Sequence, residues 1–414
     1  MQVLYFHQYF STPKGAAGTR SYEMAQALIR DGHSVTMVCA THQLGKSGLD
    51  GPFVAGQRRG AVDGIRVIEL DLSYSNYDNL LRRALVFMKF SLRSVRLALT
   101  EPFDIAFATT TPLTAGIPGI FSRWIRKKPF VFEVRDLWPE LPREMGVIKN
   151  PLVLASMSGL EWLSYHSADR CVALSPGIAE GIERRGIPSE RIAVIPNGCD
   201  LNLFHSGDPW RPAAVRDGDL LAIFTGAHGI ANGLGAVLDA AAVLRARGRD
   251  DIKLLLVGDG KLKPELVERA RKEKLDNVVF HDPVGKHRIA GLMAAADVGM
   301  QILANVPAFY YGTSPNKFFD YLAAGLPVLN NYPGWLAEII EGDRCGFAVP
   351  PCDPKAFADA LEWAADHRDE LKQMGRRARA VAARDFDRRT LGSQWVNWVL
   401  GAARRNSGKA DRAP

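Results

Sequence analysis

Short apolar runs of strand length alternate with amphipathic stretches of helical length along almost all of this 414-residue chain. That alternation predicts parallel sheets with helices on both faces. We predict strands at 2–6, 34–39, 65–70, 104–108, 130–134, 170–174 and 191–195, and further strands at 220–225, 252–257, 277–280, 297–303, 326–330 and 346–349. The pattern therefore predicts an α/β protein built from two doubly wound, Rossmann-like domains.

The length favours two domains, because single cores stop growing at roughly 250–300 residues. The segment that begins at His205 is polar and rich in proline, which is typical of inter-domain linkers. We predict a first domain at 1–204, a linker at 205–218, a second domain at 219–385, a helix at 386–400 and a disordered tail at 401–414. Because ligands of such folds bind beyond the carboxyl ends of the strands, we expect a central cleft that uses loops of both domains.

The charge and the cysteines narrow the setting in which the protein works. A net charge of +7 favours an anionic partner, and nucleic acid, nucleotide and anionic lipid all fit that sign. Five scattered cysteines indicate a reduced, cytosolic protein. The first residues lack the pattern of a signal peptide, and no segment is convincing as a membrane-spanning helix. We expect a cytoplasmic protein.

Residues 314–328 form the most informative segment, a polar loop that leads into a helix and then a buried strand. Lys317 places a positive charge near the helix N-terminus, which already favours anions. Asp320 follows on the first turns, where its carboxylate can accept hydrogen bonds from a sugar diol. Ser314, Pro315 and Asn316 complete the loop as candidate ligand-binding residues. Together they predict a site for a nucleotide-sugar.

Glycine loops follow the first strand of each predicted domain. Gly15 and Gly18 let the backbone approach a phosphate near Arg20, although an ordinary strand-to-helix turn has the same pattern. The second loop contains Gly226, with His228 and Asn232 behind it. Gly258 follows the next buried strand, where a base or sugar fits close to the backbone. For His228 the alternative is a polar loop residue with no ligand.

A buried strand runs directly into Arg135 and Asp136, at the carboxyl end where active-site groups gather in such sheets. We expect Asp136 to bind or orient an acceptor hydroxyl. The alternative is an internal ion pair between these two residues.

Metal binding is not expected. Asp217-Gly-Asp219 has the spacing of a metal–diphosphate motif, but it lies beside the linker and before a strand, so we interpret it as a turn. Two helix N-termini and Lys317 can offset the charge of a diphosphate without a metal or another cofactor.

The stretch 79–100 contains no acidic residue and predicts a basic amphipathic helix. Arg82, Lys89, Arg93 and Arg96 fall within about 60° of one another around its axis. An apolar row lies on the other side, formed by Leu81, Ala84, Leu85, Met88, Leu92 and Val95. Such a helix can dock on an anionic bilayer. The alternative is a helix packed on the core with its basic face in water.

Five motifs in order resemble the retaining glycosyltransferases of family four, which have the GT-B fold. They are the Gly15 loop with Gly32-His33, the stretch Ile195–Phe204, Leu256–Gly260, Ala295–Val298 and the segment 314–328. The resemblance implies sugar transfer from a nucleotide donor with retained configuration and without a metal. It also implies a donor site mainly in the second domain, an acceptor site in the first, and a last helix that crosses back to the first domain.

The chain departs from that family at two places. The family usually has a Glu-x7-Glu motif. Here Gly312 stands at the position of the first Glu, and Asp320 stands at the second, whose side chain in the family binds the ribose. His228 and Asn232 replace the usual Arg and Lys of the phosphate loop. We therefore expect Lys317 and Arg20 to take over the phosphate contacts. We expect Asp136 and Lys317 to have the catalytic roles. The chain has no obvious nucleophile, and retention without a nucleophile fits a front-face displacement.

The motifs at 135–140, 314–321 and 330–335 resemble a subgroup that includes N-acetylfucosaminyl-type transferases of O-antigen, capsule and exopolysaccharide assembly. This resemblance implies a UDP-linked N-acetylated deoxyhexosamine as donor and a polyprenyl-diphosphate-linked saccharide as acceptor, at the cytosolic face of the inner membrane. Two alternatives stay open: a soluble transferase with a small-molecule acceptor, and a non-catalytic nucleotide-sugar-binding protein. Nucleic acid is not an expected partner, since no aromatic–basic stacking motif appears.

Overall fold

The computed structural model of the chain describes residues 1–15, 18–42, 45–74, 80–204 and 207–410. The chain forms two compact units. The first comprises Met1–Pro196, Gly312–Ser314 and Arg389–Pro414, and the second comprises Asn197–Tyr311 and Pro315–Arg388. The first part of the chain therefore ends its unit at Pro196, upstream of the boundary predicted at 204.

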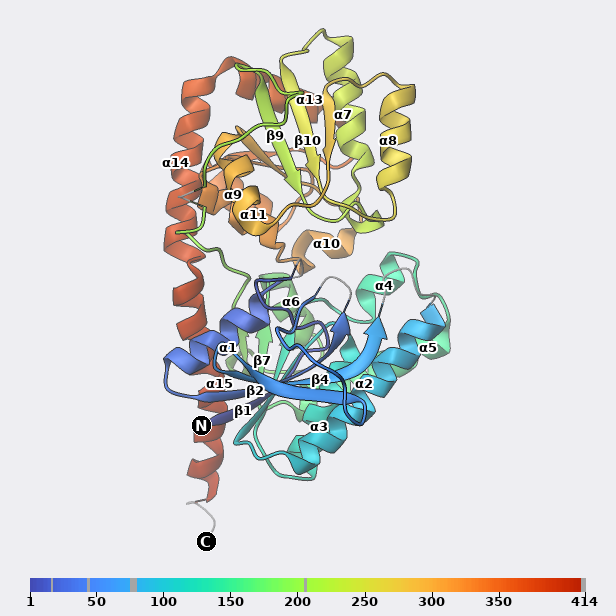
Figure 1. Cartoon of the computed structure of the whole chain (residues 1–414), viewed down its shortest axis with the longest axis vertical. Coiled ribbons are helices and arrows are strands. Elements are labelled where there is room, and N and C mark those ends of the chain that lie inside the picture. Colours follow the sequence, from blue (N-terminus) through green and yellow to red (C-terminus); the bar gives the residue numbers. More distant parts are fainter. Residues whose placement is uncertain (16–17, 43–44, 75–79, 205–206, 411–414) are drawn as a thin grey trace. The chain divides into compact units, whose positions relative to one another are not determined.

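The first unit is built on an eight-stranded sheet with the order β3-β4-β2-β1-β5-β6-β7-β8 (Figure 1). Its strands are β1 (Gln2–Phe6), β2 (Ser34–His42), β3 (Gln57–Val62), β4 (Ile65–Tyr74), β5 (Ile105–Thr109), β6 (Phe130–Val134), β7 (Arg170–Ala173) and β8 (Ile192–Val194). Seven of them lie where the sequence predicts strands. The exception is β3, which pairs antiparallel with β4 and has no apolar run to reveal it.

Helices cover both faces of this sheet. One face carries α1 (Arg20–Arg30) and α15 (Arg388–Ala410), whose apolar residues join Val3, Tyr5 and Phe107 in one cluster. The other face carries α2 (Leu80–Thr100), α3 (Ile117–Trp124), α5 (Pro151–Ser167) and α6 (Pro176–Glu183). Shorter elements are α4 (Glu140–Glu144) and the 3-10 turns Leu113–Gly116 and Ser189–Arg191.

The second unit is built on a six-stranded parallel sheet with the order β11-β10-β9-β12-β13-β14. Its strands are β9 (Leu220–Thr225), β10 (Ile252–Val257), β11 (Val278–His281), β12 (Val298–Gln301), β13 (Val328–Asn330) and β14 (Gly346–Ala348). All six were predicted. The strand order reverses between β9 and β12, and ligands of doubly wound sheets bind at such a switch point.

Helices also cover this sheet on both sides. One face carries α7 (Gly235–Ala246), α8 (Lys263–Lys272) and α13 (Pro354–Asp366). The opposite face carries α9 (Lys286–Ala295) and α11 (Asn316–Ala324), with α14 (Arg368–Asp385) packed on α11. Also present are α10 (Pro307–Gly312), α12 (Trp335–Gly342) and the 3-10 turn Ile230–Asn232. The two Rossmann-like α/β units confirm the predicted fold class.

The described part of the predicted linker is an attached segment of the second unit. The indole N–H of Trp210 donates to the Arg288 carbonyl at 3.0 Å, and the Arg288 guanidinium lies 4.4 Å from the Trp210 ring centroid. Arg211 donates to the carbonyls of Ala295 and Asp219, both at 3.0 Å. Proline and polar residues predicted an inter-domain linker, and one tryptophan and one arginine attach its described part to α9 and to the residue before β9. Asp219 accepts from the Arg216 N–H, which supports the turn predicted there.

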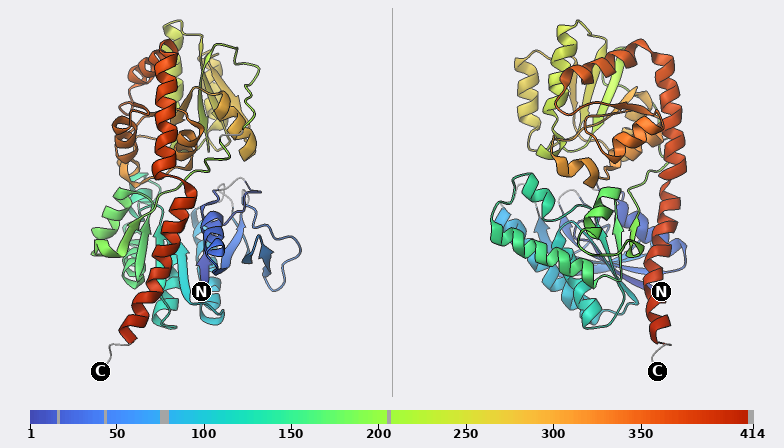
Figure 2. Two further views of the ribbon diagram at one scale, coloured as in Figure 1. Left: turned by 90° about the vertical axis from the view of Figure 1, so that its left-hand side faces the viewer. Right: turned by 180° about the vertical axis from the view of Figure 1, so that it is seen from behind.

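The last helix is longer than predicted. It continues to Ala410, so the prediction of a disordered tail is wrong for residues 401–410, and residues 411–414 lie outside the described part. Arg170 of β7 explains the continuation, because its guanidinium contacts Gly401 and donates to the Trp398 carbonyl at 2.8 Å. Ala402 is buried against the same core. Figure 2 shows α15 lying along the first unit.

Trp395 of α15 should be a main determinant of the first unit's stability. Its indole is fully buried between Tyr5 and Phe107, with ring centroids at 6.0 and 4.8 Å. We expect Trp395→Ala to reduce the free energy of unfolding by roughly 3–5 kcal/mol, measured by chemical denaturation. Gln394→Ala, at an exposed position one residue away, is the control and should change it little. Equal stability of the two variants would contradict the packing described for α15.

Candidate functional site

The first unit holds a buried ion cluster at the carboxyl ends of its central strands. Glu133 of β6 is fully buried and accepts from Arg20 through Nε at 3.0 Å and Nη2 at 2.8 Å. Arg20 also donates to the carbonyls of Ile195 and Pro196, at 2.9 and 2.7 Å. These bonds occupy the Arg20 side chain within its own unit. The phosphate contact predicted for it therefore has to compete with a buried carboxylate.

Arg135 belongs to the same cluster. Its Nε donates to Thr109 at 2.8 Å and to Glu133 at 3.3 Å, and its Nη2 donates to Ser21 at 2.8 Å. The alternative of an internal ion pair was right about the type of contact, but the carboxylate that pairs with Arg135 is Glu133 and not Asp136. Glu133 was missed by sequence reasoning. A single carboxylate inside the apolar strand 130–134 was the available signal.

Asp136 lies beside this cluster and is partly exposed. Its Oδ2 accepts from the Thr111 hydroxyl at 3.0 Å. Burial raises the pKa of the carboxyl, while the Thr111 hydrogen bond and Arg135 act in the opposite direction. A carboxylate in this position can accept a further hydrogen bond from a ligand hydroxyl.

Gly15 and Gly18 lie on either side of residues outside the described part of the chain. The Gly15 N–H donates to the Thr12 carbonyl at 3.0 Å, and Gly18 is exposed just before α1 begins. Their predicted contact with phosphate stays a prediction.

In the second unit, two glycine loops meet beyond β9 and β10. Gly226 has φ +149° and Gly258 has φ +151°, a region that favours glycine. A Cβ on Gly258 would collide with the Gly226 carbonyl, and a Cβ on Gly226 would lie 3.5 Å from the Lys317 Nζ. Both loops therefore need glycine, and the Gly226 backbone lies next to the Lys317 ammonium.

Lys317 lies in the first turn of α11, beside two other residues of the predicted site, Asn232 and Gly226. Its Nζ donates to Asn232 Oδ1 at 2.7 Å and lies 4.1 Å from the Phe224 ring centroid. Asn232 in turn donates to the Ala227 carbonyl at 2.7 Å. Burial lowers the pKa of Lys317 to about 7. Among the residues that the structure describes, Lys317 has no carboxylate partner, so an anionic ligand can take that role.

His228 lies behind the same loops and is fully buried. Neither ring nitrogen has a hydrogen-bond partner among the described residues. Burial, followed by the charge of Lys263, lowers the pKa of His228 to about 4, so the imidazole is neutral at pH 7. Lys263 was missed by sequence reasoning. Its Nζ donates to the Gly258 carbonyl at 2.9 Å and to Asp282 at 2.6 Å, which fixes the second glycine loop.

Asp320 lies one turn after Lys317, and its Oδ1 is buried without a partner among the described residues. Burial raises its pKa to about 6, against the charges of Lys286 and Arg388. Burial, followed by the charge of Asp320, raises the pKa of the Cys199 thiol, so Asp320 lies near the segment where the second unit begins. The Cys199 N–H in turn donates to the Phe386 carbonyl at 3.0 Å.

The rest of the 314–328 segment is less closely engaged. Pro315 is the N-cap residue of α11 and Asn316 is exposed. Ser314 is grouped with the first unit, whereas Pro315 belongs to the second. Gly325 ends α11 in the left-handed conformation at φ +72°.

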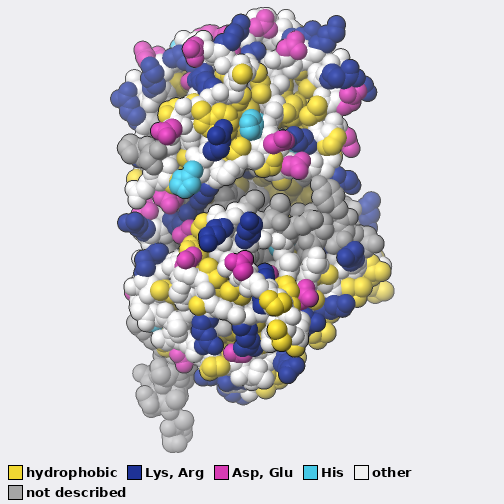
Figure 3. Space-filling view, in the orientation of Figure 1, with side chains coloured by type: hydrophobic (Ala, Val, Ile, Leu, Met, Phe, Trp, Pro, Cys, Tyr) yellow, Lys and Arg dark blue, Asp and Glu magenta, His cyan; other side chains and the backbone are white. Residues whose placement is uncertain are grey.

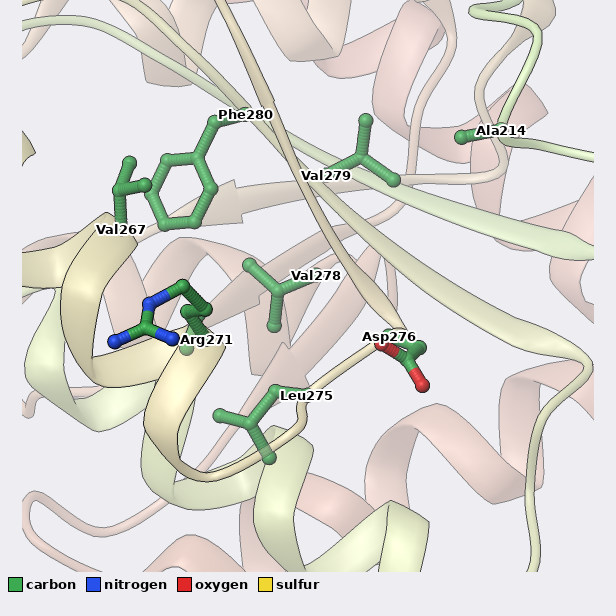
Figure 4. Close-up of a pocket in the computed structure, with 9 residues that line it drawn as sticks. Ala214, Val267, Arg271, Leu275, Asp276, Val278, Val279 and Phe280 are labelled. Atoms are coloured by element: carbon green, nitrogen blue, oxygen red, sulfur yellow. The ribbon is translucent and has the colours of Figure 1, made fainter.

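A separate pocket of about 400 Å³ lies at the edge of the second sheet (Figure 4). Its lining comes mainly from β11 and α8, and consists of Ala214, Val267, Ala270, Arg271, Leu275, Asp276, Val278, Val279 and Phe280. None of the predicted site residues lines it.

Comparisons with known proteins agree with this arrangement. Residues 15–198 match the family described as Glycosyl transferase 4-like domain, and residues 220–367 match Glycosyl transferases group 1. The putative colanic acid biosynthesis glycosyltransferase WcaL of Escherichia coli (strain K12) is 24% identical over 265 residues, which are 60% of this chain. They are 64% of that relative, so the chain spans less than two thirds of its length.

Solved structures show the same fold. Sucrose-phosphate synthase from Thermosynechococcus elongatus has a TM-score of 0.73 at 18% identity, covering 99% of both chains. HepE of Anabaena, solved in complex with UDP-glucose, has a TM-score of 0.66 at 18% identity and covers 97% of this chain and 100% of its own. With two glycosyltransferase domains matched in order on two Rossmann-like units, the chain belongs to the glycosyltransferases of GT-B fold.

Proposed function

We propose that this protein transfers a sugar from a UDP-sugar donor, with retention of configuration, in the synthesis of a bacterial surface polysaccharide. The observation that carries the proposal is the Lys317 ammonium, bonded to Asn232 beside the Gly226 backbone at the start of α11. A cation without a carboxylate partner among the described residues, next to a helix N-terminus, suits a diphosphate. The chain thus supplies charge for a leaving diphosphate from its own residues, and we propose no resident metal.

The choice of donor rests on two kinds of support. HepE, which shares the fold, was solved with UDP-glucose, and WcaL is described as acting in colanic acid biosynthesis. For the sugar itself we propose an N-acetylated deoxyhexosamine. The family that the chain resembles usually has a glutamate where Gly312 stands. A Cβ added to Gly312 would meet no atom within 4 Å, so a lack of space does not explain why the glutamate is missing.

The proposed roles follow from charge and hydrogen bonding. Lys317, Asn232 and the neutral His228 bind the diphosphate, and Asp320 accepts from the ribose. Asp136 binds the acceptor hydroxyl on the first unit. Retention through front-face displacement lets the leaving phosphate oxygen take the proton of the acceptor hydroxyl, so that no protein nucleophile is required.

For the acceptor we propose a polyprenyl-diphosphate-linked saccharide at an anionic membrane surface. Within the part of the chain that the structure describes, no helix has the length and apolar character to span a membrane. The support comes from α2, where Leu81, Leu85, Met88 and Leu92 are 72, 53, 45 and 63% exposed. Its core contacts come instead from Val86, Phe90, Leu97 and Ala98. The alternative of a core-packed helix with a solvated basic face therefore also describes α2, but its core contacts come from a row other than the predicted apolar one, which is left exposed.

Neighbouring helices extend the exposed apolar surface. On α3 and just after it, Phe121, Trp124 and Ile125 are exposed, and on α5 so are Leu152, Val153, Trp162 and Leu163. Both α2 and α5 contact α3. Figure 3 shows hydrophobic side chains at the margin of the first unit where α2 and α5 lie in Figure 1, with basic side chains beside them. Apolar area bordered by basic residues suits an anionic bilayer.

A direct test of the proposed function is a screen of UDP-, GDP- and dTDP-sugars by calorimetry, followed by transfer assays. We expect UDP-sugars to bind, and transfer to a polyprenyl-diphosphate-linked saccharide to proceed in the presence of EDTA with a retained anomeric product. Binding without hydrolysis or transfer would instead support a non-catalytic nucleotide-sugar-binding protein. Binding of none of the donors would overturn the proposal.

Replacement of Lys317 by Met should weaken UDP binding and stabilise the empty protein. Loss of a charge-assisted hydrogen bond costs about 1.5–3 kcal/mol of binding, whereas a buried ammonium destabilises the fold. With a folded pKa of about 7, below that of the unfolded chain, Lys317 makes wild-type stability rise as pH increases above 7. Lys317→Met should lose that dependence in thermal melts.

Lys261→Met, which changes an exposed lysine in the same unit, is the control and should alter neither property. UDP affinity unchanged in Lys317→Met would refute the diphosphate assignment.

The membrane proposal predicts that the wild-type protein floats with anionic liposomes. Leu85→Ser combined with Leu92→Ser removes two exposed apolar side chains and should abolish flotation without loss of folding. Lys89→Glu should weaken it by about 1 kcal/mol or more, since each basic residue near the surface contributes roughly that amount. Val267→Ser, which changes an exposed residue of α8, is the control. Absence of flotation in the wild-type protein would favour a soluble enzyme with a small-molecule acceptor, and flotation that none of these changes affects would contradict the assignment to α2.

A further inference from the structure

Gln8, directly after β1, has a side chain that the fold leaves unsatisfied. It is fully buried, and neither its amide oxygen nor its amide nitrogen has a partner among the described residues. Buried amides are ordinarily hydrogen-bonded, because an unpaired one loses its bonds to water without replacement. A side chain kept in this state at the carboxyl end of a central strand indicates a ligand.

The backbone places Gln8 at the carboxyl end of β1. The His7 N–H donates to the Val38 carbonyl and the Gln8 carbonyl accepts from Ala40, both at 3.0 Å, so this segment is still bonded to β2. Residues 8 and 9 form a turn, in which Tyr9 packs on the apolar cluster beneath α2.

Two further polar groups lie at this end of the sheet. Trp138, after β6, packs on the same apolar cluster, and its buried indole N–H has no acceptor among the described residues. Asp136 lies two residues after the end of β6. Between β1 and β6 lies β5, which continues into Thr111, the partner of Asp136.

The charges of this edge define the ligand. The guanidinium groups of Arg20 and Arg135 are bound to Glu133, and burial with the nearby Arg135 keeps the pKa of His7 well below its usual value, so His7 is neutral. An anionic ligand would therefore meet two carboxyl groups, Glu133 and Asp136, and cations that already have partners. An uncharged group with hydroxyls suits an amide that both donates and accepts, and an indole that donates.

We propose that Gln8 and Trp138 form a subsite that binds an uncharged saccharide residue of the acceptor, whose reacting hydroxyl Asp136 then holds. This inference rests on the proposed function and deepens it. Only the sugar end of the acceptor binds at this edge, and its diphosphate binds elsewhere. The Gln8 amide gives up its enclosed position to reach a sugar hydroxyl and gains in the complex the hydrogen bonds it lacks in the empty protein.

The test uses the full chain labelled with ¹⁵N and a panel of methyl glycosides of uncharged hexoses and N-acetylhexosamines. We expect at least one glycoside to shift the Trp138 indole N–H signal. Gln8→Leu should weaken that binding about tenfold, as for a lost hydrogen bond, and leave the melting temperature unchanged or higher. Trp138→Phe keeps an aromatic ring but removes the indole N–H. The signal that it loses is therefore that of Trp138, and the variant should weaken glycoside binding similarly.

Ser94→Ala is the matched control, because the Ser94 hydroxyl is also buried without a partner among the described residues of the same unit, but lies in the second half of α2, which leads to the amino end of β5. It should leave glycoside binding unchanged. An indole signal that no glycoside moves, or equal glycoside affinity in Gln8→Leu and wild type, would overturn the subsite. UDP binding measured in parallel reports on the proposed function separately, since Gln8 and Trp138 belong to the other unit.

Discussion

The fully buried carboxylate of Glu133 is the interaction on which the first unit depends. Burial alone would raise its pKa, but Arg20 and Arg135 outweigh that effect and hold the pKa below its usual value. Both oxygens are satisfied, one by Arg20 and the other by Thr109 and Arg135. Buried charges are tolerated when they are paired this completely, and removal of one partner leaves the others uncompensated.

This ion cluster also fixes the geometry of the ligand-binding edge. Through Arg20 it joins the first residue of α1 to β6 and to the carbonyls of Ile195 and Pro196, where this part of the chain leaves the unit. Through Arg135 it reaches Ser21 and β5. Asp136 follows directly in the chain. The side chains proposed to bind the acceptor thus lie on a support whose charges are already neutralised, which leaves the edge suited to uncharged groups.

Most of the fold could be predicted from the sequence, because parallel buried strands have apolar runs that period and composition identify. The edge strand β3 was missed because its residues 57–62 are largely polar or small. The attachment of the linker segment was not predicted, because proline-rich composition says nothing about the contact of Trp210 with Arg288 of α9, which is distant in sequence. The extension of α15 depends on Arg170, a contact across more than 200 residues that no local pattern reveals.

The sequence predicted the site residues that local loop and helix patterns identify. It did not predict the contacts that pair residues far apart in the chain. Gly226, Asn232 and Lys317 were identified from loop and helix patterns, and the structure brings them together. Arg20 was proposed as a phosphate ligand because it also stands at a helix start, but its pairing with Glu133 spans 113 residues. The contrast between Lys317 and Arg20, two cations in similar local settings, depends on whether a buried carboxylate reaches them.

The contribution of α15 to the first unit has a consequence for how this chain folds during synthesis. The N-terminal strands leave the ribosome first, yet Trp395 and Val399 of their core are made only after the whole second unit. Domains usually fold in the order of their synthesis. Here the second unit can complete its core first, while the earlier strands keep an apolar face uncovered until the last helix appears. That interval is when this protein most needs a chaperone.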